Sequence, residues 1–321
     1  MDEPVVEIVI LNYNGEGIVD KCVQSILDKT TYRNYKIVFA DNGSVDKSLT
    51  QAEKKYANNE KVLFIRIPYN TGYPKGMNWG VQERIVQGTS EFFIPLNDDI
   101  IITDPDWIQK LLKPMQDPKV GMTCCSLKTP SGRIQRGGML QFNGLTMSYI
   151  KPFDHEKDGT IDVAAMAACL VRREVFLKIG GFDEKYTPFN SEENDFSLRT
   201  SYAGYDVHFI HDLFLFHDHG ATLKKVESLF TYYITKRNCI RFRLLHYPLH
   251  WIFFSLFPEY RVWLSMFFFR DGKKVSFNKD CLKRVKLYVL AIVVNLLQLG
   301  EIIDRRAQLQ TQKKVNLPPA R

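Results

Sequence analysis

Residues 5–15, VVEIVILNYNG, contain the first structural unit of the chain. The apolar run over residues 5–11 has the length of a strand, and the polar cluster at residues 12–15 ends it. Apolar residues then recur at helical spacing over residues 18–27, with charged residues between them. We therefore expect a strand that leads through a tight polar turn into an amphipathic helix.

The same alternation of strand and helix patterns continues beyond this unit. Further strands are predicted at residues 36–40, 62–67, 92–96 and 207–216, and helices at residues 46–56, 77–87 and 191–203. Short strands and turns replace the alternation over residues 120–144, and an apolar segment follows at residues 163–176. The alternation predicts an α/β protein with a parallel sheet that helices cover on both faces.

Polar clusters follow three of the predicted strands. They are Asn12-Tyr13-Asn14, Asp41-Asn42-Gly43-Ser44 and Asn97-Asp98-Asp99. Ligands bind beyond the carboxyl ends of parallel strands, so the three clusters are expected to meet at one edge of the sheet. Asp41 could accept a hydrogen bond from a pyrimidine base, although its cluster also suits a plain tight turn.

The Asp98-Asp99 pair is a candidate cation site. Adjacent carboxylates repel one another unless a cation shares the site, and their hard oxygen ligands suit Mg²⁺ or Mn²⁺. A solvated turn is the alternative interpretation. His217 and His219 follow the last predicted strand at alternate positions, so both could reach one site, as metal ligands or as plain surface residues.

Residues 192–195, Glu-Glu-Asn-Asp, place three carboxylates within four residues. One of them, next to a bound hydroxyl group, could act as a general base, and crowding raises carboxyl pKa values in a way that helps this role. The alternative is an acidic first turn of a helix, in which Asp195 pairs with Arg199. The local sequence leaves both interpretations open.

The charge of the chain is distributed unevenly. Its 321 residues suffice for one large α/β domain and a smaller appendage. Residues 1–220 carry 24 Lys and Arg against 30 Asp and Glu, whereas residues 221–321 carry 19 against 6. An acidic body with a basic, aromatic-rich tail predicts two functions. The N-terminus shows no secretory leader, and six scattered cysteines without metal-ligand spacing predict reduced core residues in a cytosolic protein.

The order of these motifs resembles the family 2 inverting glycosyltransferases with the GT-A fold, over roughly residues 4–245. The likeness is greatest to the rhamnosyltransferase-like branch, which builds cell-surface polysaccharides. The stretches that carry it are IVILNYNG (8–15), FADNGSVDKS (39–48), NTGYPKGMNWG (70–80), FIPLNDDIII (93–102), GRIQRGGML (132–140), AACLVRREVFLKIGGFDE (167–184), EENDFSLR (192–199) and HDHG (217–220). The resemblance implies a Rossmann-like nucleotide-diphospho-sugar transferase domain followed by a mainly helical C-terminal region.

The resemblance assigns a donor site by position. Its residues would be Leu11, Asn12, Tyr13, Asn14, Asp41, Asn42, Gly72, Asn78, Asn97 and Asp98. Asp41 would bind uracil or thymine, and Asn97 and Asp98 would lie against ribose and phosphate. Asp99 and His217 would hold a divalent cation, Mg²⁺ or Mn²⁺. Asn97 replaces the first Asp of the family's D-x-D-like motif, a variant that weakens only the argument for two carboxylate ligands.

The resemblance also implies a catalytic base. Glu193 aligns with the catalytic Asp of the family pattern Glu-Asp-x-Asp-Leu, and its longer side chain leaves Glu192 a rival, with Asp195 in the same catalytic cluster. The implied mechanism is a single in-line displacement. It would transfer a sugar from a UDP- or dTDP-sugar to a hydroxyl of a glycan or lipid-linked acceptor, with inversion.

Two domains are expected from these patterns. They are a catalytic domain over residues 1–245, with a nucleotide-sugar half at 1–120 and an acceptor half at 121–245, and a basic, aromatic-rich, helical region over residues 246–321. Within the latter, residues 249–269 are mostly apolar, but Glu259 and Arg261 lie at their centre and disfavour a simple membrane span. The apolar segment at residues 287–299 is too short to span a membrane.

The C-terminal composition favours peripheral contact with an anionic membrane, at its cytoplasmic face. Phe and Trp side chains would enter the headgroup region. The basic residues that would meet anionic lipid are Lys273, Lys274, Lys283, Arg284 and Lys286. A helical subdomain or a homo-oligomer interface is the alternative, and nucleic acid is not expected because no recognition motif accompanies the charge.

Other classes of protein fit the sequence less well. A nucleotidyltransferase should carry a Gly-rich, basic phosphate loop after the first strand, and residues 12–17 do not resemble one. A hydride-transfer enzyme is disfavoured because no G-x-G-x-x-G motif follows a strand. The non-enzymatic alternative is a catalytically inactive, membrane-associated scaffold with the same fold.

Overall fold

In the computed structural model of the protein, the chain forms two compact units. The described residues are 3–86, 88, 90–135, 137–143, 146–152, 157–218, 228–249, 252, 269–271, 274–276 and 279–316. The first unit comprises Met1–Met139, Pro152–Pro188 and Glu192–Lys224, and the second comprises Leu140–Lys151, Phe189–Ser191 and Lys225–Arg321. The domain boundary at residue 245 stays a prediction.

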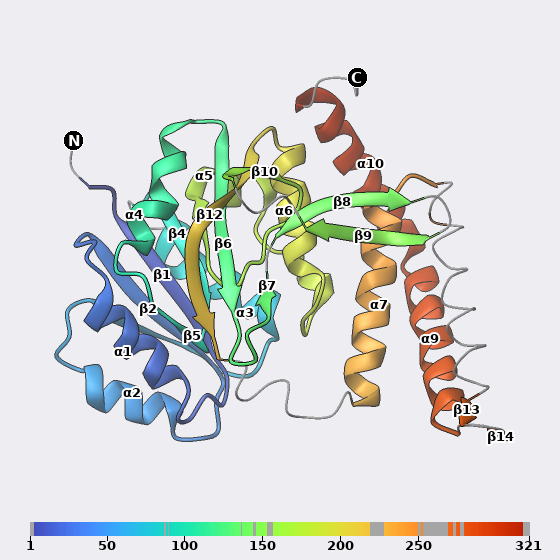
Figure 1. The fold of residues 1–321 in the computed structure, drawn as a ribbon, viewed down its shortest axis with the longest axis horizontal. Helices are drawn as coiled ribbons and strands as arrows, with labels where there is room; N and C mark the ends of the chain where they lie inside the picture. The colour runs from blue at the N-terminus through green and yellow to red at the C-terminus, as the bar shows by residue number, and fades with distance from the viewer. Residues whose placement is uncertain are drawn as a thin grey trace. The chain divides into compact units, whose positions relative to one another are not determined.

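Four parallel strands form one half of the main sheet (Figure 1). They are β1 (Val6–Asn12), β2 (Tyr35–Asn42), β3 (Val62–Ile67) and β4 (Phe92–Asn97), in the order β3-β2-β1-β4. The register pairs Asn12 with Asp41 and Leu11 with Asn97, so the polar ends of three strands lie side by side. The parallel sheet predicted for this part of the chain is confirmed.

The other half of the sheet is mixed. β6 (Val120–Lys128) and β12 (Asp206–His217) run parallel, but β11 (Cys169–Arg172) lies antiparallel between β4 and β6. The short strands β5 (Ile100–Ile101), β7 (Ile134–Gln135) and β10 (Gly159–Ile161) also pair antiparallel. The expected parallel sheet does not extend to this half, because parallel neighbours need long crossovers and the helical alternation stops near residue 120.

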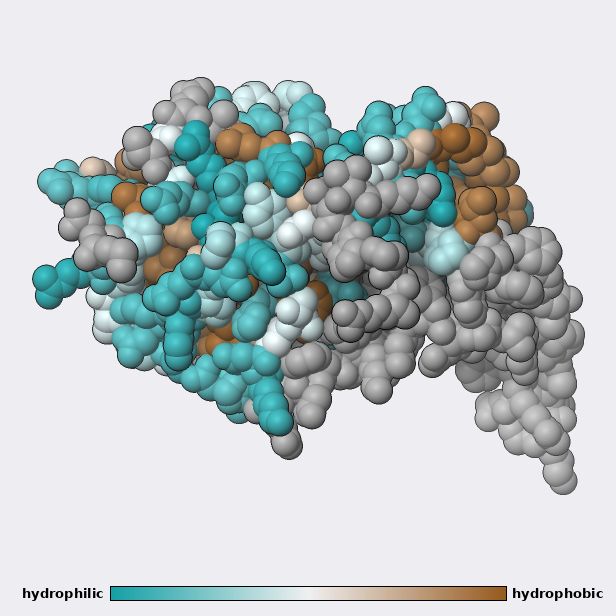
Figure 2. Space-filling model, turned by 90° about the horizontal axis from the view of Figure 1, so that it is seen from above, coloured by the Kyte–Doolittle hydropathy of each residue, from teal (hydrophilic) through white to brown (hydrophobic). Residues whose placement is uncertain are grey.

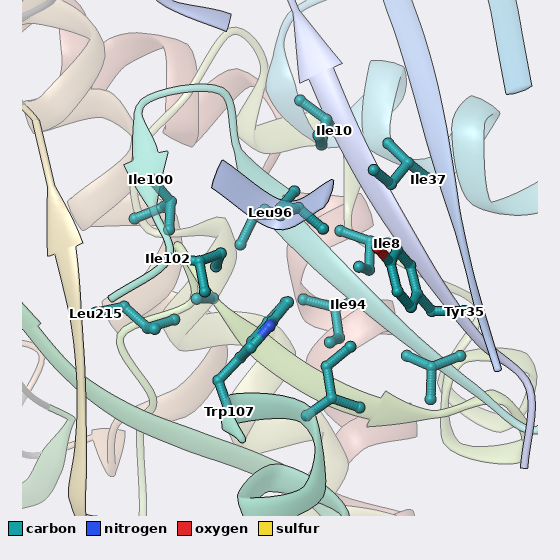
Figure 3. Packing of buried hydrophobic residues seen from close by; sticks show 14 of the residues in the cluster. Ile8, Ile10, Tyr35, Ile37, Ile94, Leu96, Ile100, Ile102, Trp107 and Leu215 are labelled. Atoms are coloured by element: carbon teal, nitrogen blue, oxygen red, sulfur yellow. The ribbon is translucent and has the colours of Figure 1, made fainter. Parts of the chain in front are cut away.

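Helices cover both faces of the sheet, as predicted. One hydrophobic cluster includes α1 (Val19–Lys29), α2 (Ser48–Tyr56) and α4 (Trp107–Leu112), and another includes α3 (Tyr73–Val81), α5 (Arg173–Ile179) and α6 (Glu192–Tyr202). Ile8 and Ile10 belong to the first cluster and Val9 to the second, since successive strand residues point to opposite faces. Figure 3 shows Ile8 and Ile10 with Leu96 and Trp107 in the first cluster.

The helix predicted at residues 77–87 begins earlier, at Tyr73. Pro74 fits the first helical turn, where no backbone N–H is needed, and Gly72 enters it with a φ of 79°. After Val81 the helix widens into a π-helical turn, Gln82–Val86. Two 3₁₀ turns, Lys113–Gln116 and Glu184–Tyr186, complete the helical elements of the described first unit.

Four cysteines are buried free thiols in the first unit: Cys22, Cys124, Cys125 and Cys169. Burial raises the pKa of the Cys22, Cys125 and Cys169 thiols well above the ordinary value, so these groups stay protonated. Buried, protonated thiols behave as small hydrophobic side chains, which agrees with the predicted core role.

The described part of the second unit is mainly helical, as predicted. Its helices are α7 (Leu229–His246), α9 (Lys279–Leu297) and α10 (Leu299–Asn316). Ile240 of α7 packs with Tyr288 and Ala291 of α9, and Arg306 of α10 donates to the backbone oxygen of Tyr247 at 2.7 Å. Two-stranded ladders join β8 (Gly138–Asn143) to β9 (Thr146–Pro152), and β13 (Phe269–Asp271) to β14 (Lys274–Ser276).

Among the described helices, no single one has both the length and the apolar character to cross a membrane. Leu282–Leu297 and Leu299–Lys313 reach that length and hydropathy only together, as a pair bent by 68°. The apolar segment at residues 249–269 lies outside the described residues, except for Leu249, Ile252 and Phe269. Lys273 also lies outside them.

Candidate active site

Asn12 lies at the end of β1, at the centre of a polar cluster. Its amide nitrogen lies 2.7 Å from Asp41 Oδ1, 3.0 Å from Ser44 Oγ and 2.9 Å from Ser48 Oγ. Asp41 Oδ2 accepts a further hydrogen bond from the backbone N–H of Ser44 at 3.0 Å. The Asp41 carboxylate is therefore fixed in place, and each oxygen keeps acceptor capacity for one more donor.

The loops that follow β1 and β2 are joined by hydrogen bonds. The backbone N–H of Asn14 donates to Ser44 Oγ at 3.0 Å, and Asn14 Oδ1 accepts from the backbone N–H of Val45 at 2.9 Å. The backbone N–H of Glu16 donates to Asp46 Oδ2 at 2.9 Å. Asn14 has a φ of 53°, a left-handed conformation that asparagine tolerates better than most residues. The loops after β1 and β2 are therefore held together by hydrogen bonds and form one rim at this edge of the sheet.

Gly15 connects this rim with the acidic end of β4. A Cβ atom at position 15 would lie 2.5 Å from Asn12 Oδ1 and 3.1 Å from Asp98 Oδ2. Any larger residue would push one of these side chains away, so glycine leaves room for Asn12 and Asp98 on its two sides. The polar end of β1 and the acidic end of β4 therefore both border Gly15.

The pairing of β5 with β12 brings Asp99 and His217 together. Ile100 pairs with His217, and the backbone N–H of Asp218 donates to the backbone oxygen of Asp99 at 2.9 Å. His217 Nε2 lies 3.0 Å from Asp99 Oδ1, and both side chains are buried. His217 Nδ1 lies 3.0 Å from Gln135 Oε1, a contact that orients the imidazole ring.

Asp99 and His217 fit a divalent cation. Asp99 Oδ1 is buried and, apart from its 3.0 Å contact with His217 Nε2, accepts no hydrogen bond from the described residues, which leaves a lone pair for a ligand. Two ligands about 2.1 Å from one octahedral cation lie about 3 Å apart, close to the observed separation. His219, the second expected histidine, lies outside the described residues.

The titration of several groups links the acidic strand end with α6. Burial and the Asp99 carboxylate raise the pKa of Asp98 to about 7, while His217 opposes the rise. Burial also raises the pKa of Glu193, and His217 opposes that rise too. Burial raises the pKa of Tyr73 well above its ordinary value, and Glu192, Glu193 and Asp98 add to the effect. These couplings indicate that Asp98, Glu193 and His217 share one electrostatic environment.

Glu193 is open to solvent, yet protein atoms surround its carboxyl closely enough to raise its pKa, as expected of a group in a recess. Its Oε2 accepts a hydrogen bond from the backbone N–H of Met166 at 3.5 Å. The Met166 segment runs beside the end of β4, because the backbone N–H of Asn97 donates to the backbone oxygen of Ala167 at 3.0 Å. This segment therefore connects Glu193 with the acidic strand end.

Glu192 and Asp195, the other two acids of the cluster, are buried. Arg199 Nε donates to Asp195 Oδ2 at 2.6 Å, with side chains only 2% and 1% exposed. Arg199 Nη1 also donates to the backbone oxygen of Gly181 at 2.8 Å. Asp195 thus forms the pair that the helical alternative predicted, and Glu193 is the acid of the cluster that solvent reaches.

Two expected donor residues use their side-chain amides inside the protein. Asn42 Oδ1 accepts from the backbone N–H of Thr71 at 3.0 Å, and its Nδ2 donates to the backbone oxygen of Gly72 at 3.3 Å. Asn78 Oδ1 accepts from the backbone N–H of Phe182 at 2.8 Å, and its Nδ2 donates to the backbone oxygen of the same residue at 2.9 Å. Both asparagines therefore hold neighbouring backbone segments in place with their side chains.

The remaining expected donor residues differ in exposure. Tyr13 is 45% exposed on the loop after β1, while Leu11 and Asn97 are partly buried at their strand ends. Gly72 is buried, and a Cβ atom there would lie 2.8 Å from the Cα atom of Pro188. Tyr13 is thus open to a ligand, whereas Gly72 is a point of close backbone approach.

Several residues of this edge were not predicted from the sequence. They are Gly15, Ser48, Gln135 and Met166. All except Met166 lie within the stretches that carry the family resemblance, so their position was available but their contacts were not. Met166 acts through its backbone N–H, for which a single sequence gives no signal.

A second group that could hold a metal lies elsewhere in the first unit. Ligand atoms of Asp158, His211 and Asp212 all lie within 4.8 Å of one another. His211 Nδ1 is 2.8 Å from Asp158 Oδ1, and Lys110 Nζ is 3.5 Å from Asp212 Oδ2. His211 precedes His217 by six residues of β12, or up to about 20 Å of strand, so the two places are distinct. The sequence shows no ligand motif at this group.

The sequence matches the model of Glycosyl transferase family 2 over residues 7–180, which is more than half of the chain. The chain belongs to glycosyl transferase family 2. It is therefore a glycosyltransferase, and the family resemblance seen in the sequence is confirmed.

Two relatives of this glycosyltransferase are named for O-antigen biosynthesis and for the transfer of L-rhamnose. It is 28% identical over 218 residues to the O-antigen biosynthesis protein RfbC of Myxococcus xanthus, which covers 64% of this chain and 16% of RfbC. It is 25% identical over 226 residues to the N-acetylglucosaminyl-diphospho-decaprenol L-rhamnosyltransferase of Mycobacterium tuberculosis, which covers 63% of this chain and 72% of that protein. The chain thus spans a small part of the length of RfbC.

The fold is also shared with solved structures. The crystal structure of GalNAc-T7 with UDP, GalNAc and Mn²⁺ superposes with a TM-score of 0.60 at 17% identity, covering 82% of this chain and 50% of that chain. This likeness confirms the expected GT-A fold of the glycosyltransferase.

Proposed function

We propose that this glycosyltransferase transfers a sugar from a UDP- or dTDP-sugar to an acceptor hydroxyl, with inversion at the anomeric carbon. The observation that carries the proposal is the continuous polar edge between Asp41 and Asp99. Within that edge, Asn12 Oδ1 and Asp98 Oδ2 both border Gly15, 2.5 Å and 3.1 Å from where its Cβ atom would lie. A base at one end and a diphosphate at the other would match this order of groups.

The pyrimidine would be recognised by Asp41. Its carboxylate is held by Asn12 and Ser44, which supports a fixed acceptor for the N–H that uracil and thymine share. Tyr13 is 45% exposed on the neighbouring loop and would line the base. Asn42 and Asn78 would act indirectly, by holding the chain beneath the donor.

Asp99 and His217 would hold a divalent cation, Mg²⁺ or Mn²⁺. When bound, the cation would neutralise charge on the departing diphosphate. The buried Asp99 Oδ1, which accepts no hydrogen bond from the described residues, and its 3.0 Å separation from His217 Nε2 support this assignment. The presence of Mn²⁺ with UDP in the GalNAc-T7 structure is in keeping with it.

Glu193 would be the general base. It would take the proton of the acceptor hydroxyl while that oxygen attacks the anomeric carbon, and the bond to the diphosphate breaks on the opposite face. A single displacement of this kind inverts the anomeric centre. The raised pKa supports the role, because it makes the carboxylate a stronger base than an ordinary glutamate.

The acceptor would be a glycan or a lipid-linked glycan. The names of RfbC and of the decaprenol-linked rhamnosyltransferase support this class of acceptor. The C-terminal region, residues 246–321, would contact an anionic membrane at its cytoplasmic face, and a lipid-linked acceptor would be anchored in that membrane. The net positive charge of this region supports the contact.

A donor panel tests the proposed function. The protein is incubated with UDP-, dTDP- and GDP-sugars, with Mn²⁺ or with EDTA, and released nucleotide is measured before product mass. We expect release from pyrimidine donors only, and only with the cation. Release from GDP-sugars alone would contradict the role of Asp41, and no binding of any donor would favour the inactive scaffold.

A further inference from the structure

Helix α9 is apolar on two faces. Its inner face packs Tyr288 and Ala291 against α7. Its outer face exposes a second set of large apolar side chains: Leu282 (43%), Val289 (49%), Leu290 (46%), Val293 (43%), Leu296 (55%) and Leu297 (82%). These residues recur at intervals of three and four, so they form one stripe, here called the α9 surface. Figure 2 shows exposed hydrophobic side chains gathered in a contiguous patch toward the right of the view.

Basic residues lie at the N-terminal end of the α9 surface. Lys283 and Lys286 are exposed there, and the sequence from residue 281 to residue 300 contains no Asp or Glu. The two lysines border a hollow of about 380 Å³ whose other walls include Phe230 and Leu287. Phe230 is 59% exposed. Positive charge and apolar surface therefore occur side by side at this end.

The arrangement of the helices adds to the positive charge. Arg284 lies over the ring of Tyr232, and Asn295 Nδ2 donates to the backbone oxygen of Arg237 at 3.0 Å, so α7 and α9 run in the same direction. The N-terminal ends of both helices, which carry partial positive charge, thus lie at the lysine end. The chain then turns by 68° into α10.

We propose that the α9 surface docks the protein on a membrane that contains anionic lipid. The lysine end faces the lipid phosphates, and the apolar stripe enters the boundary between headgroups and acyl chains. The inference rests on the proposed function, because it names the surface by which the C-terminal region would reach a membrane-anchored acceptor.

A second copy of the chain could also cover the α9 surface, but the positive charge at the lysine end disfavours such a contact. A two-fold self-contact would bring the same patch against itself, so Lys283 and Lys286 would face their own copies. Residues 279–297 carry one acid, Asp280, against four basic residues, so two copies would still bring net positive charge against net positive charge. Anionic lipid supplies that charge.

The first test removes apolar side chains from the stripe. The full chain is sedimented with phosphatidylcholine vesicles that contain phosphatidylserine, as wild type and as Val293→Ser with Leu297→Ser. Both side chains are exposed, so the fold should be retained, and binding should fall by about tenfold or more. Ile134→Ser with Leu177→Ser, at 41% and 47% exposure in the first unit, is the matched control and should bind as wild type does.

The second test removes charge. Lys283→Gln with Lys286→Gln should weaken binding to the anionic vesicles by about 30-fold, at about 1 kcal/mol for each basic residue. The same pair should make little difference on phosphatidylcholine alone. Lys113→Gln with Lys119→Gln, two exposed lysines of the first unit, is the control.

Three outcomes would overturn the inference. They are absence of wild-type binding to anionic vesicles, unchanged binding of both α9 variants, and light scattering that shows a dimer abolished by the Val293 and Leu297 changes. UDP binding with Mn²⁺ is measured on the same samples. Donor binding without vesicle binding would reject the α9 surface alone, and vesicle binding without donor binding would reject the proposed function alone.

Discussion

Three acids within one turn of α6 have different surroundings. Glu193 is open to solvent and contacts the Met166 segment, whereas Glu192 is buried and Asp195 is paired with Arg199. A general base must reach an incoming hydroxyl group, so exposure separates Glu193 from its neighbours. The sequence alone could only place the three together.

Glu193→Gln should keep donor binding and lose turnover by about 10²–10⁴-fold, because an amide cannot accept the proton. Calorimetry with UDP and Mn²⁺ measures binding, and nucleotide release with acceptor measures turnover. Glu192→Gln makes the same change one residue away and should retain turnover. If Glu192→Gln is inactive and Glu193→Gln is fully active, the base is Glu192.

The pH dependence of turnover reports on the same carboxyl. Burial raises the pKa of Glu193 above its ordinary 4.5. A base works only when deprotonated, so turnover should increase as the pH rises through this higher pKa and fall below it. The residual rate of Glu193→Gln should lack this dependence. An acid limb centred at or below pH 4.5 in the wild type would argue against the assignment.

Asp195→Ala should lower the free energy of unfolding by about 3–5 kcal/mol, because it leaves the buried Arg199 guanidinium without its carboxylate. Chemical denaturation measures the change. Glu53→Ala is the control, since it breaks the exposed pair with Arg66 and should cost less than about 1 kcal/mol. Equal losses in the two variants would show that the buried pair has no special structural role.

At the scale of elements, Asn78 ties α3 to the turn that follows α5. Asn78→Ala leaves the backbone N–H and oxygen of Phe182 without these partners, so unfolding should become easier by about 1–3 kcal/mol. Thermal denaturation followed by circular dichroism checks the change. Asn58→Ala, at an exposed turn position, should be close to neutral. A fully stable Asn78→Ala variant that lost donor binding would instead indicate direct contact with the donor.

Strands β1 to β4 could be predicted from the sequence because each is a short apolar run that ends in turn residues. The antiparallel insertion of β11 could not, since the run at residues 163–176 reads equally as strand or helix. The directions in which individual side chains point could not be predicted from the sequence either. The family resemblance placed Asn42 and Asn78 near the donor, but hydrogen bonds to Thr71 and Phe182 turn their amides into the protein.

For the whole molecule, sequence order indicated the family, while contact between distant residues required the fold. Asn12 and Asp98 both border Gly15 because β1 and β4 are neighbours and glycine leaves room between the two side chains. Asp99 and His217 meet through the β5–β12 pairing. The Asp158–His211–Asp212 group shows the converse, because a plausible cation site arose without any sequence motif.

In the proposed mechanism, Asp99 binds the cation that holds the donor diphosphate. Calorimetry of UDP with and without Mn²⁺ tests it on the wild type, on Asp99→Asn and on Asp212→Asn, which removes a ligand from the other candidate group. We predict Mn²⁺-dependent binding of UDP by the wild type and by Asp212→Asn, and its loss in Asp99→Asn. Undiminished metal-dependent binding by Asp99→Asn, or its loss in Asp212→Asn alone, would contradict the account.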